Sequence, residues 1–170
     1  MHSTIAVNVE APAALVFELA RDVERWPALL PHYLRVSPRA RNPDSSITAE
    51  MVALRALVPL VGLGLPVAWR ARVWAEEDPL RLRFVHVGGA TNGMDVTWRF
   101  VSQDAGCQVS IDHDFHPRVP MWAWSIDRLF VRPIARRTLT TFKAIAEAVA
   151  GSMREGRRSE HPDQPKMTST

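Results

Sequence analysis

Polar and hydrophobic positions alternate at the start of the chain. Within residues 3–9, Ile5, Val7 and Val9 fall on one face, and polar or small residues fall between them. This two-residue period is typical of a half-buried β-strand, whose successive side chains point to opposite faces. The pattern therefore predicts a first strand over residues 3–9.

A helical period follows directly. Pro12 stands where the first turn of a helix tolerates a proline, and the next apolar residues recur at helical spacing. These residues are Leu15, Val16, Leu19 and Val23. The run predicts short helical structure that stops near Trp26 and Pro27, because proline disfavours a continuing helix.

Strand-like segments then follow one another closely. They are separated by the turn sequences NPDS, EEDP, GG and DAG, so the links are too short for parallel crossovers. The pattern predicts an antiparallel meander. Its expected strands cover residues 34–42, 46–55, 67–77, 80–88, 91–102 and 106–116.

Residues 120–150 return to a helical period. The apolar positions in this register are Ile126, Phe130, Ile134, Ile145 and Val149, and Pro133 predicts a kink or break. One strand, two short helices, six strands and a long helix define an α+β fold. The long helix can bury its apolar side only across the concave face of a curved sheet of about seven strands, and a cavity remains where the two do not meet.

Length and composition fit one globular domain. The 170 residues are 46% hydrophobic, and residues 1–150 carry all the periodic segments. Residues 151–170 are rich in charged residues and lack apolar periodicity, which predicts a disordered tail.

Charge and cysteine content narrow the class of protein. The net charge of +3 does not indicate nucleic-acid binding. Cys107 is the single cysteine, and its place in a strand favours a buried apolar role. The first residues lack a secretory signal pattern, which favours a cytoplasmic location. Phosphate-binding glycine motifs, paired catalytic carboxylates and Ser/His/Asp or Cys/His signatures are absent from the sequence, so we expect no cofactor.

Residues 56–69 stand out because none has a polar side chain, although Arg55 and Arg70 flank them. The segment is too short to cross a membrane, which takes about 20 residues. Three interpretations stay open. The segment is a loop buried on the core, or its residues 56–66 form a lid over a pocket, or it is a patch that contacts a membrane surface.

Several segments resemble a known family. IAVNVEAPAALVFELARDVERWP at the start, the Asp78-Pro79 turn and GGATNGMDVTWRF are similar to the START-like superfamily, also called SRPBCC. WPALLPHY is most similar to the polyketide cyclase and aromatase branch. The coenzyme Q-binding branch is the second branch that the chain resembles. The resemblance covers about residues 3–150. It implies a helix-grip fold around a hydrophobic pocket.

The resemblance also implies places for particular residues. Two short helices would close one end of the cavity, with Trp26 at its base and Tyr33 at its mouth. In similar cyclases an inward arginine often precedes the Asp-Pro turn, but here that position is Ala75. Arg70 and Arg72 have the opposite parity, so they would face inward only through a β-bulge.

Strand parity places two histidines on inward faces. His86 shares a face with Leu82 and Phe84, and His113 shares one with Ile111 and Phe115. Their strands flank the 91–102 strand, so their backbones should lie about 10 Å apart, twice the spacing of neighbouring strands.

Three interpretations of these histidines stay open. They are neutral core residues, pocket residues that bind or protonate ligand oxygens, or metal ligands. The metal interpretation is weakest, because His113 and His116 fall on opposite faces of one strand.

The expected site follows from these faces. Cyclisation of a polyketide needs a base near neutral pKa, a group that polarises a carbonyl and a cavity that holds the chain. We assign the catalytic roles to Tyr33, His86 and His113. The expected cavity lining is Trp69, Ala71, Val73, Phe84, Met94, Val96, Trp98, Ile111, Phe115, Ile126 and Phe130.

Two functions remain in competition. The first is a hydrophobic-ligand protein that cyclises or dehydrates an aromatic polyketide-like substrate. The second is a non-catalytic carrier of a lipid or quinone, which the apolar 56–69 segment and the missing arginine favour. A protein-interaction module has little support, since no segment has a partner-binding motif.

Overall fold

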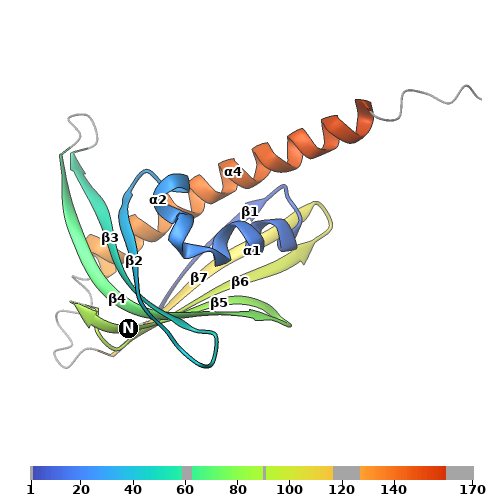
Figure 1. The fold of residues 1–170 in the computed structure, drawn as a ribbon. Helices are drawn as coiled ribbons and strands as arrows, with labels where there is room; N and C mark the ends of the chain where they lie inside the picture. Colours follow the sequence, from blue (N-terminus) through green and yellow to red (C-terminus); the bar gives the residue numbers. More distant parts are fainter. Residues whose placement is uncertain (1, 59–62, 90, 117–126, 160–170) are drawn as a thin grey trace, which may run out of the picture.

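The computed structural model describes residues 2–58, 63–89, 91–116 and 127–159. In these residues a seven-stranded sheet curves around one long helix, and shorter helices cover the rest of its concave face (Figure 1). This is the predicted α+β helix-grip fold, so the predicted fold class is confirmed.

The sheet is an antiparallel meander with the first strand added at one edge. Its order is β1-β7-β6-β5-β4-β3-β2, so β1 pairs with the last strand and each other pair is a hairpin neighbour. The strands are β1 (His2–Val9), β2 (Tyr33–Arg41), β3 (Ile47–Val58), β4 (Leu63–Glu77), β5 (Leu80–Gly89), β6 (Met94–Gln103) and β7 (Gly106–Phe115). The largest differences from the predicted strands lie at the β3–β4 hairpin and at the start of β6.

Three short helical segments follow β1. They are α1 (Ala13–Arg21), the 3₁₀ turn η1 (Val23–Arg25) and α2 (Trp26–Leu29). Trp26 and Pro27 therefore begin α2, whereas the prediction had helical structure stop there. The physical reason is that proline lacks only a backbone N–H, which the first turn of a helix does not need.

The interpretation of residues 56–69 as a loop is wrong for the described part of this segment. β3 continues to Val58 and β4 begins at Leu63, so the two strands form a long hairpin. Pro66 and Ala68 are exposed, while Val67 and Trp69 are partly buried. Small apolar residues fill the outward positions, so the usual polar alternation of a strand is invisible in the sequence. Residues 59–62 lie outside the described residues, and membrane contact stays a prediction.

The long C-terminal helix begins with a change of helix type. A π-helical turn, η3 (Asp127–Val131), runs into α4 (Arg132–Ser159), and Pro133 is the second residue of α4. The predicted break near Pro133 thus coincides with this junction. Residues 120–126 of the predicted helix, Ile126 among them, lie outside the described residues.

The buried side of α4 differs from the predicted one. Its buried apolar side chains are Ala135, Leu139, Phe142, Ala146 and Ala150, whereas Ile134, Ile145 and Val149 are only partly buried. α4 also continues to Ser159, so residues 151–159 are helical and the prediction of a disordered tail is wrong for them. Propensity explains this, since most of these residues favour or tolerate a helix without a buried face.

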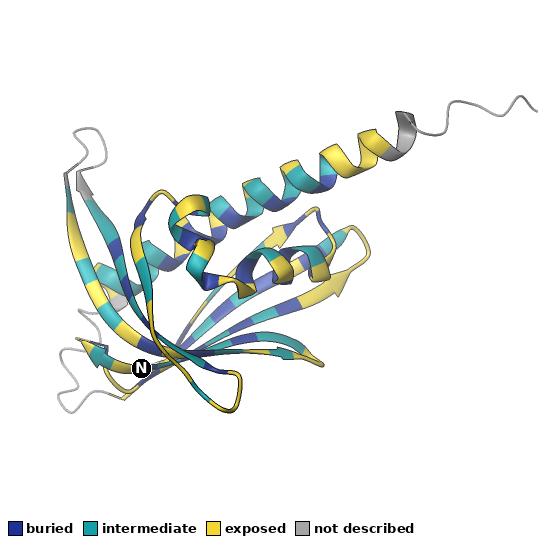
Figure 2. Ribbon diagram, in the orientation of Figure 1, coloured by how far each residue is buried: buried dark blue, intermediate teal, exposed yellow. Residues whose placement is uncertain are grey.

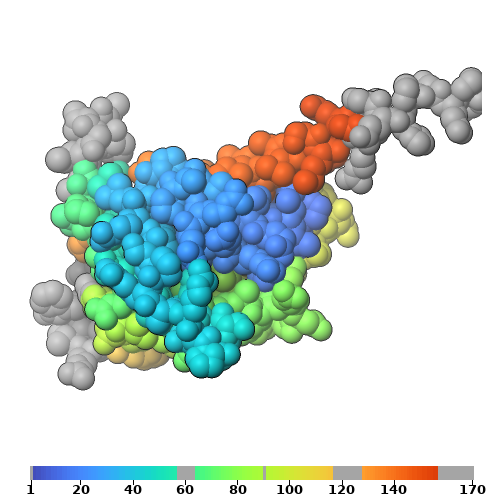
Figure 3. Space-filling view, viewed as in Figure 1, coloured from blue at the N-terminus to red at the C-terminus, as the bar shows by residue number. Residues whose placement is uncertain are grey.

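The core lies between the concave face of the sheet and the helices (Figure 2). α1 contributes Val16 and Phe17, and the ring of Phe17 packs at 77° to that of Phe100 of β6 with centroids 5.5 Å apart. On the face shown in Figure 3, atoms of α1, α2 and β2 form a continuous surface over this core. Cys107 is buried, as predicted.

Candidate functional site

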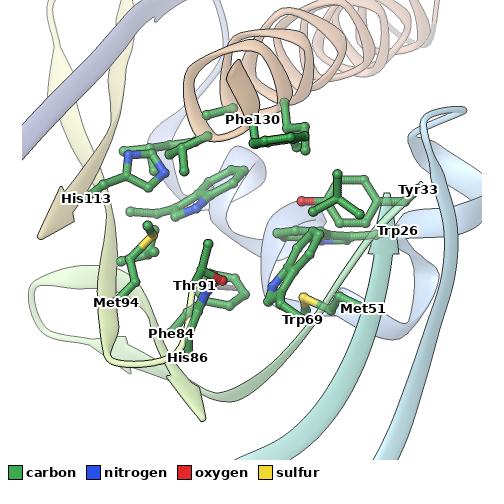
Figure 4. Close-up of a pocket in the computed structure, with 17 residues that line it drawn as sticks. Trp26, Tyr33, Met51, Trp69, Phe84, His86, Thr91, Met94, His113 and Phe130 are labelled. Atoms are coloured by element: carbon green, nitrogen blue, oxygen red, sulfur yellow. Dashed lines mark hydrogen bonds between the residues drawn. The ribbon is translucent and has the colours of Figure 1, made fainter. Parts of the chain in front are cut away.

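A cavity of about 80 Å³ lies between the sheet and the start of α4 (Figure 4). Strands β2 to β7 supply its walls, and η3 with the first turn of α4 covers it. Its lining is mostly aromatic and aliphatic. The described lining residues are Trp26, Tyr33, Met51, Val67, Trp69, Phe84, His86, Thr91, Met94, Val96, Trp98, Ile111, His113, Phe130, Val131, Ile134 and Ala135.

The structure brings most of the predicted site residues to this cavity. Tyr33, His86 and His113 all line it. So do the predicted apolar residues Trp69, Phe84, Met94, Val96, Trp98, Ile111 and Phe130. Ala71, Val73 and Phe115 are buried in the core away from the lining, and Ile126 lies outside the described residues.

His86 lies near the end of β5, with its ring on the cavity wall. Its Nδ1 is 2.6 Å from the hydroxyl oxygen of Thr91, and its ring stacks on Trp69 at 17° with centroids 5.9 Å apart. Burial lowers the pKa of His86 to about 3, with a further contribution from the charge of His113. His86 is therefore neutral at neutral pH.

His113 faces the same cavity from β7. Its backbone pairs with Val96 of β6, and β6 lies between β5 and β7, as the meander predicts. His116 is exposed, so the two histidines of this segment separate as their parity predicts. Among the described residues, no three His, Cys, Asp or Glu side chains are placed to hold a metal ion.

Tyr33 is buried rather than placed at a mouth, with only 6% of its surface exposed. Its ring packs nearly perpendicular to that of Trp26, at 82°, with centroids 5.0 Å apart. Burial raises the pKa of the Tyr33 phenol well above its ordinary value, and a hydrogen bond with Thr138 opposes this in part. The sequence pattern did not reveal this burial, which places Tyr33 inside the fold.

His32 is a buried polar residue to which the sequence analysis assigned no role. Its Nε2 lies 2.8 Å from the Thr138 hydroxyl, which itself donates to the carbonyl of Ile134. His32 must therefore donate from Nε2, which leaves Nδ1 buried without a partner among the described residues. Burial, with the nearby charge of Arg137, lowers the pKa of His32 to about 4.

The base of the cavity is an aromatic cluster, which we define as Trp26, Phe84, Trp98 and Phe142. Trp26 contacts each of the other rings at centroid distances of 5.4–5.8 Å. Its indole N–H donates to the carbonyl of Ala20, 2.9 Å away. Trp26 is thus the central ring of this cluster.

We call Arg55, Leu65 and Leu129 the rim of the cavity, because they lie beside the lining residues Val67 and Phe130. Arg55 and Leu65 pair across β3 and β4, one step beyond the cavity residue Val67 on the same face. The Arg55 Nε donates to the carbonyl of Leu129, which precedes the cavity residue Phe130. Leu65 and Leu129 are 43% and 47% exposed.

The cavity wall holds no Asp, Glu, Lys or Arg among its described residues. Arg70 and Arg72 are exposed, and Arg72 bonds Ser46 and Asp44. A bulge does interrupt the pairing of β4 with β5 between Arg70 and Ala71, but it turns neither arginine inward. Neither Arg70 nor Arg72 therefore takes the place of the inward arginine that similar cyclases often have.

The volume sets a limit on the ligand. A site of about 80 Å³ holds several water molecules, whereas a cavity that binds benzene has about 150 Å³. A polycyclic ligand would therefore fit only if side chains of the cavity lining move apart.

Comparison with known proteins assigns the family. The family model described as polyketide cyclase / dehydrase and lipid transport matches residues 9–144, so the chain belongs to this family. None of the curated protein sequences is significantly similar to it. In the described part of the chain, no helix is both long and apolar enough to cross a membrane.

Solved structures share the fold at low sequence identity. The Zhui aromatase/cyclase from Streptomyces sp. R1128 superimposes with a TM-score of 0.69 at 20% identity, over 86% of this chain and 93% of that one. A START superfamily protein from Mycobacterium smegmatis gives 0.66 at 15% identity, over 87% and 98%. The di-domain ARO/CYC StfQ from the steffimycin biosynthetic pathway gives 0.67 at 17% identity, over 88% of this chain and 52% of that chain.

Proposed function

We propose that this protein binds a planar hydrophobic molecule that carries oxygen atoms, such as an aromatic polyketide. The observation that carries the proposal is the apolar cavity, in which Tyr33, His86, Thr91 and His113 are polar. Small-molecule sites usually combine a large apolar wall with a few placed polar groups. Membership of the polyketide cyclase / dehydrase and lipid transport family supports the same ligand class.

The absence of charged side chains from the described wall restricts the part of the ligand that is buried. A carboxylate or phosphate would lose its hydration there without gaining a cation, which costs several kcal/mol. The enclosed part of the ligand is therefore neutral. A lipid or quinone carrier stays the alternative, since its ring or tail would also be neutral.

Cyclisation or dehydration is the second candidate function. It is favoured by the presence of Tyr33, His86 and His113 in the lining of one cavity. His86, with a pKa of about 3, is a poor proton acceptor at neutral pH, so its role would be to donate a hydrogen bond to a carbonyl oxygen. The cavity would contribute mainly by holding the chain with its reacting carbons close together.

Binding is tested by titration of tryptophan fluorescence, because Trp26, Trp69 and Trp98 line the cavity. Aromatic polyketide intermediates and a ubiquinone analogue serve as ligands. Ala135→Phe fills the cavity, and Ala144→Phe places the same ring on the exposed side of α4. We expect Ala135→Phe to weaken binding at least tenfold and Ala144→Phe to leave it unchanged, with thermal melting as a check on folding. Equal affinity in both variants would contradict the proposal.

Turnover separates the enzyme from the carrier. His86→Gln, His113→Gln and Tyr33→Phe are each assayed for product formation and for affinity on the same preparations. In an enzyme, product formation falls by roughly 10² or more while affinity changes only several-fold. In a carrier no product forms, and each change alters affinity by the roughly 0.5 to 1.5 kcal/mol of one hydrogen bond.

A further inference from the structure

Thr91 holds a fixed position beside His86. It lies in the turn between β5 and β6, where the Met94 N–H donates to the Thr91 carbonyl at 3.0 Å and the Gly93 N–H donates to the His86 carbonyl at 2.8 Å. Gly93 has a φ of 85°, a conformation that glycine adopts without strain. The backbone of this turn therefore fixes the place of the Thr91 hydroxyl relative to the His86 ring (Figure 4).

The hydrogen bond between these side chains has two possible directions. If Thr91 donates to Nδ1, the hydroxyl hydrogen and Nδ1 are both satisfied, and the N–H at Nε2 is the single donor left over. If Nδ1 donates to Thr91 instead, the hydroxyl hydrogen needs another acceptor, and no further hydrogen bond of the Thr91 side chain is seen among the described residues. Buried polar groups are nearly always paired, so the first arrangement is favoured.

We propose that Thr91 fixes His86 in the tautomer with hydrogen on Nε2, so that the cavity selects ligands with a carbonyl oxygen at this point. Nε2 is the ring nitrogen left for a ligand, because Nδ1 is bonded to Thr91. A carbonyl oxygen accepts this N–H and brings no hydrogen of its own, whereas a ligand hydroxyl would need a second acceptor. The inference rests on the proposed binding function and names its ligand class as ketones and quinones.

Two further observations support a single orientation and charge state of the ring. Trp69 stacks on it nearly in parallel, which limits rotation of the imidazole plane. The lowered pKa of His86 keeps the ring neutral at neutral pH, so that one tautomer can dominate. In this state His86 polarises a ligand carbonyl without removing a proton from the ligand.

The tautomer is measured in the free protein by ¹⁵N NMR of the histidine rings, with His86→Gln to assign the signals. We expect His86 to be protonated at Nε2 and unprotonated at Nδ1. Thr91→Val removes the donor at nearly constant size and should shift the ring toward a mixture of tautomers, while Thr91→Ser should restore the original state. Protonation at Nδ1 in the native protein, or no change in Thr91→Val, would overturn the inference.

Ligand selection is measured with fluorenone and fluorene, which have nearly the same shape and differ in one carbonyl oxygen. The native protein should prefer fluorenone by about 2- to 12-fold, the effect of one neutral hydrogen bond. Thr91→Val should lose most of this preference and keep its affinity for fluorene within about twofold. Thr91→Ser should keep the preference, and Thr97→Val, on the outer face of β6, serves as the matched control.

The outcomes separate the two proposals. If neither fluorene nor fluorenone binds to any variant, while larger aromatic ligands also fail, the proposed binding function is wrong. If both bind equally well, and Thr91→Val changes nothing, binding stands and the tautomer inference is overturned. The NMR measurement decides the tautomer in either case, because it needs no ligand.

Discussion

The base and the rim of the cavity differ in how their side chains are held. At the base, Trp26 is fully buried and packs against the rings of Phe84, Trp98 and Phe142. At the rim, Leu65 and Leu129 are nearly half exposed. Here the hydrogen bond from Arg55 to the carbonyl of Leu129 links β3 to η3.

This difference separates the residues that stabilise the fold from those that control entry to the cavity. Buried aromatic surface contributes most of its free energy where water is excluded, so the base should dominate the stability of the fold. Segments with few buried contacts open more readily, and binding sites commonly use them for entry. We therefore expect substitutions at the base to change unfolding and substitutions at the rim to change exchange with solvent.

The largest effect is expected from Trp26→Ala. It removes the indole from four ring contacts and from its hydrogen bond to Ala20, and should lower the free energy of unfolding by about 3 to 5 kcal/mol. Trp74→Ala, on the outer face of the sheet, is the matched control. Denaturant unfolding gives both values, and similar losses in the two variants would remove the distinction between the base and the rest of the sheet.

Acid should act in part through His32, whose ring is fully buried between the α2–β2 connection and α4, and in part through His86, whose pKa is lowered to about 3. The pKa of His32 falls from 6.5 to about 4 on folding, so the unfolded chain binds a proton first as pH drops. Stability is full above pH 6.5 and is lost between pH 6.5 and 4, by up to about 3 kcal/mol for this group. His32→Gln should make the curve of unfolding free energy against pH less steep in this window, with the contribution of His86 remaining. An unchanged slope would contradict this role of His32.

At the rim, Arg55→Ala should loosen η3 while costing only about 1 kcal/mol, the worth of one partly exposed hydrogen bond. We expect amide exchange in residues 128–131 to accelerate several-fold, with little change in melting temperature. Arg39→Ala removes an exposed ion pair with Glu50 and is the control. Equal exchange in the two variants would show that Arg55 does not restrain η3.

The smallest effect is expected from Leu65→Ser. Because this side chain is already 43% exposed, the free energy of unfolding should change by less than about 0.5 kcal/mol. Leu82→Ala, whose side chain is fully buried in the neighbouring strand β5, should cost about 2 to 5 kcal/mol. If Leu65→Ser lowered the free energy of unfolding by more than about 1 kcal/mol, the rim would contribute to stability as the base does.

The fold was predictable because each segment shows its own period. Alternation defined β1, helical spacing defined α1, and short polar turns required the antiparallel meander that the structure has. The outer part of the β3–β4 hairpin, residues 56–58 and 63–66, was missed because apolar residues such as Pro66 occupy its exposed positions. The helical residues 151–159 were missed because composition was taken to favour disorder.

The site was only partly predictable. Strand parity placed His86, His113 and Trp69 on the inner face, and all three line the cavity. It gave no indication of Thr91, which reaches His86 from a turn, or of Ala135, which lies on α4. Parity assigns a face, but it does not say how far along that face the cavity extends, so Ala71, Val73 and Phe115 were included although they lie in the core.

The sequence by itself determined the order of elements, the inward faces of the strands and the family, because these depend on local periods and short motifs. Only the tertiary structure decided which side chains share the cavity and what state they are in. The pairing of His32 with Thr138 joins residues far apart in the chain, and the lowered pKa of His86 follows from burial that other elements create. Such properties depend on the whole arrangement of neighbours, which no single segment encodes.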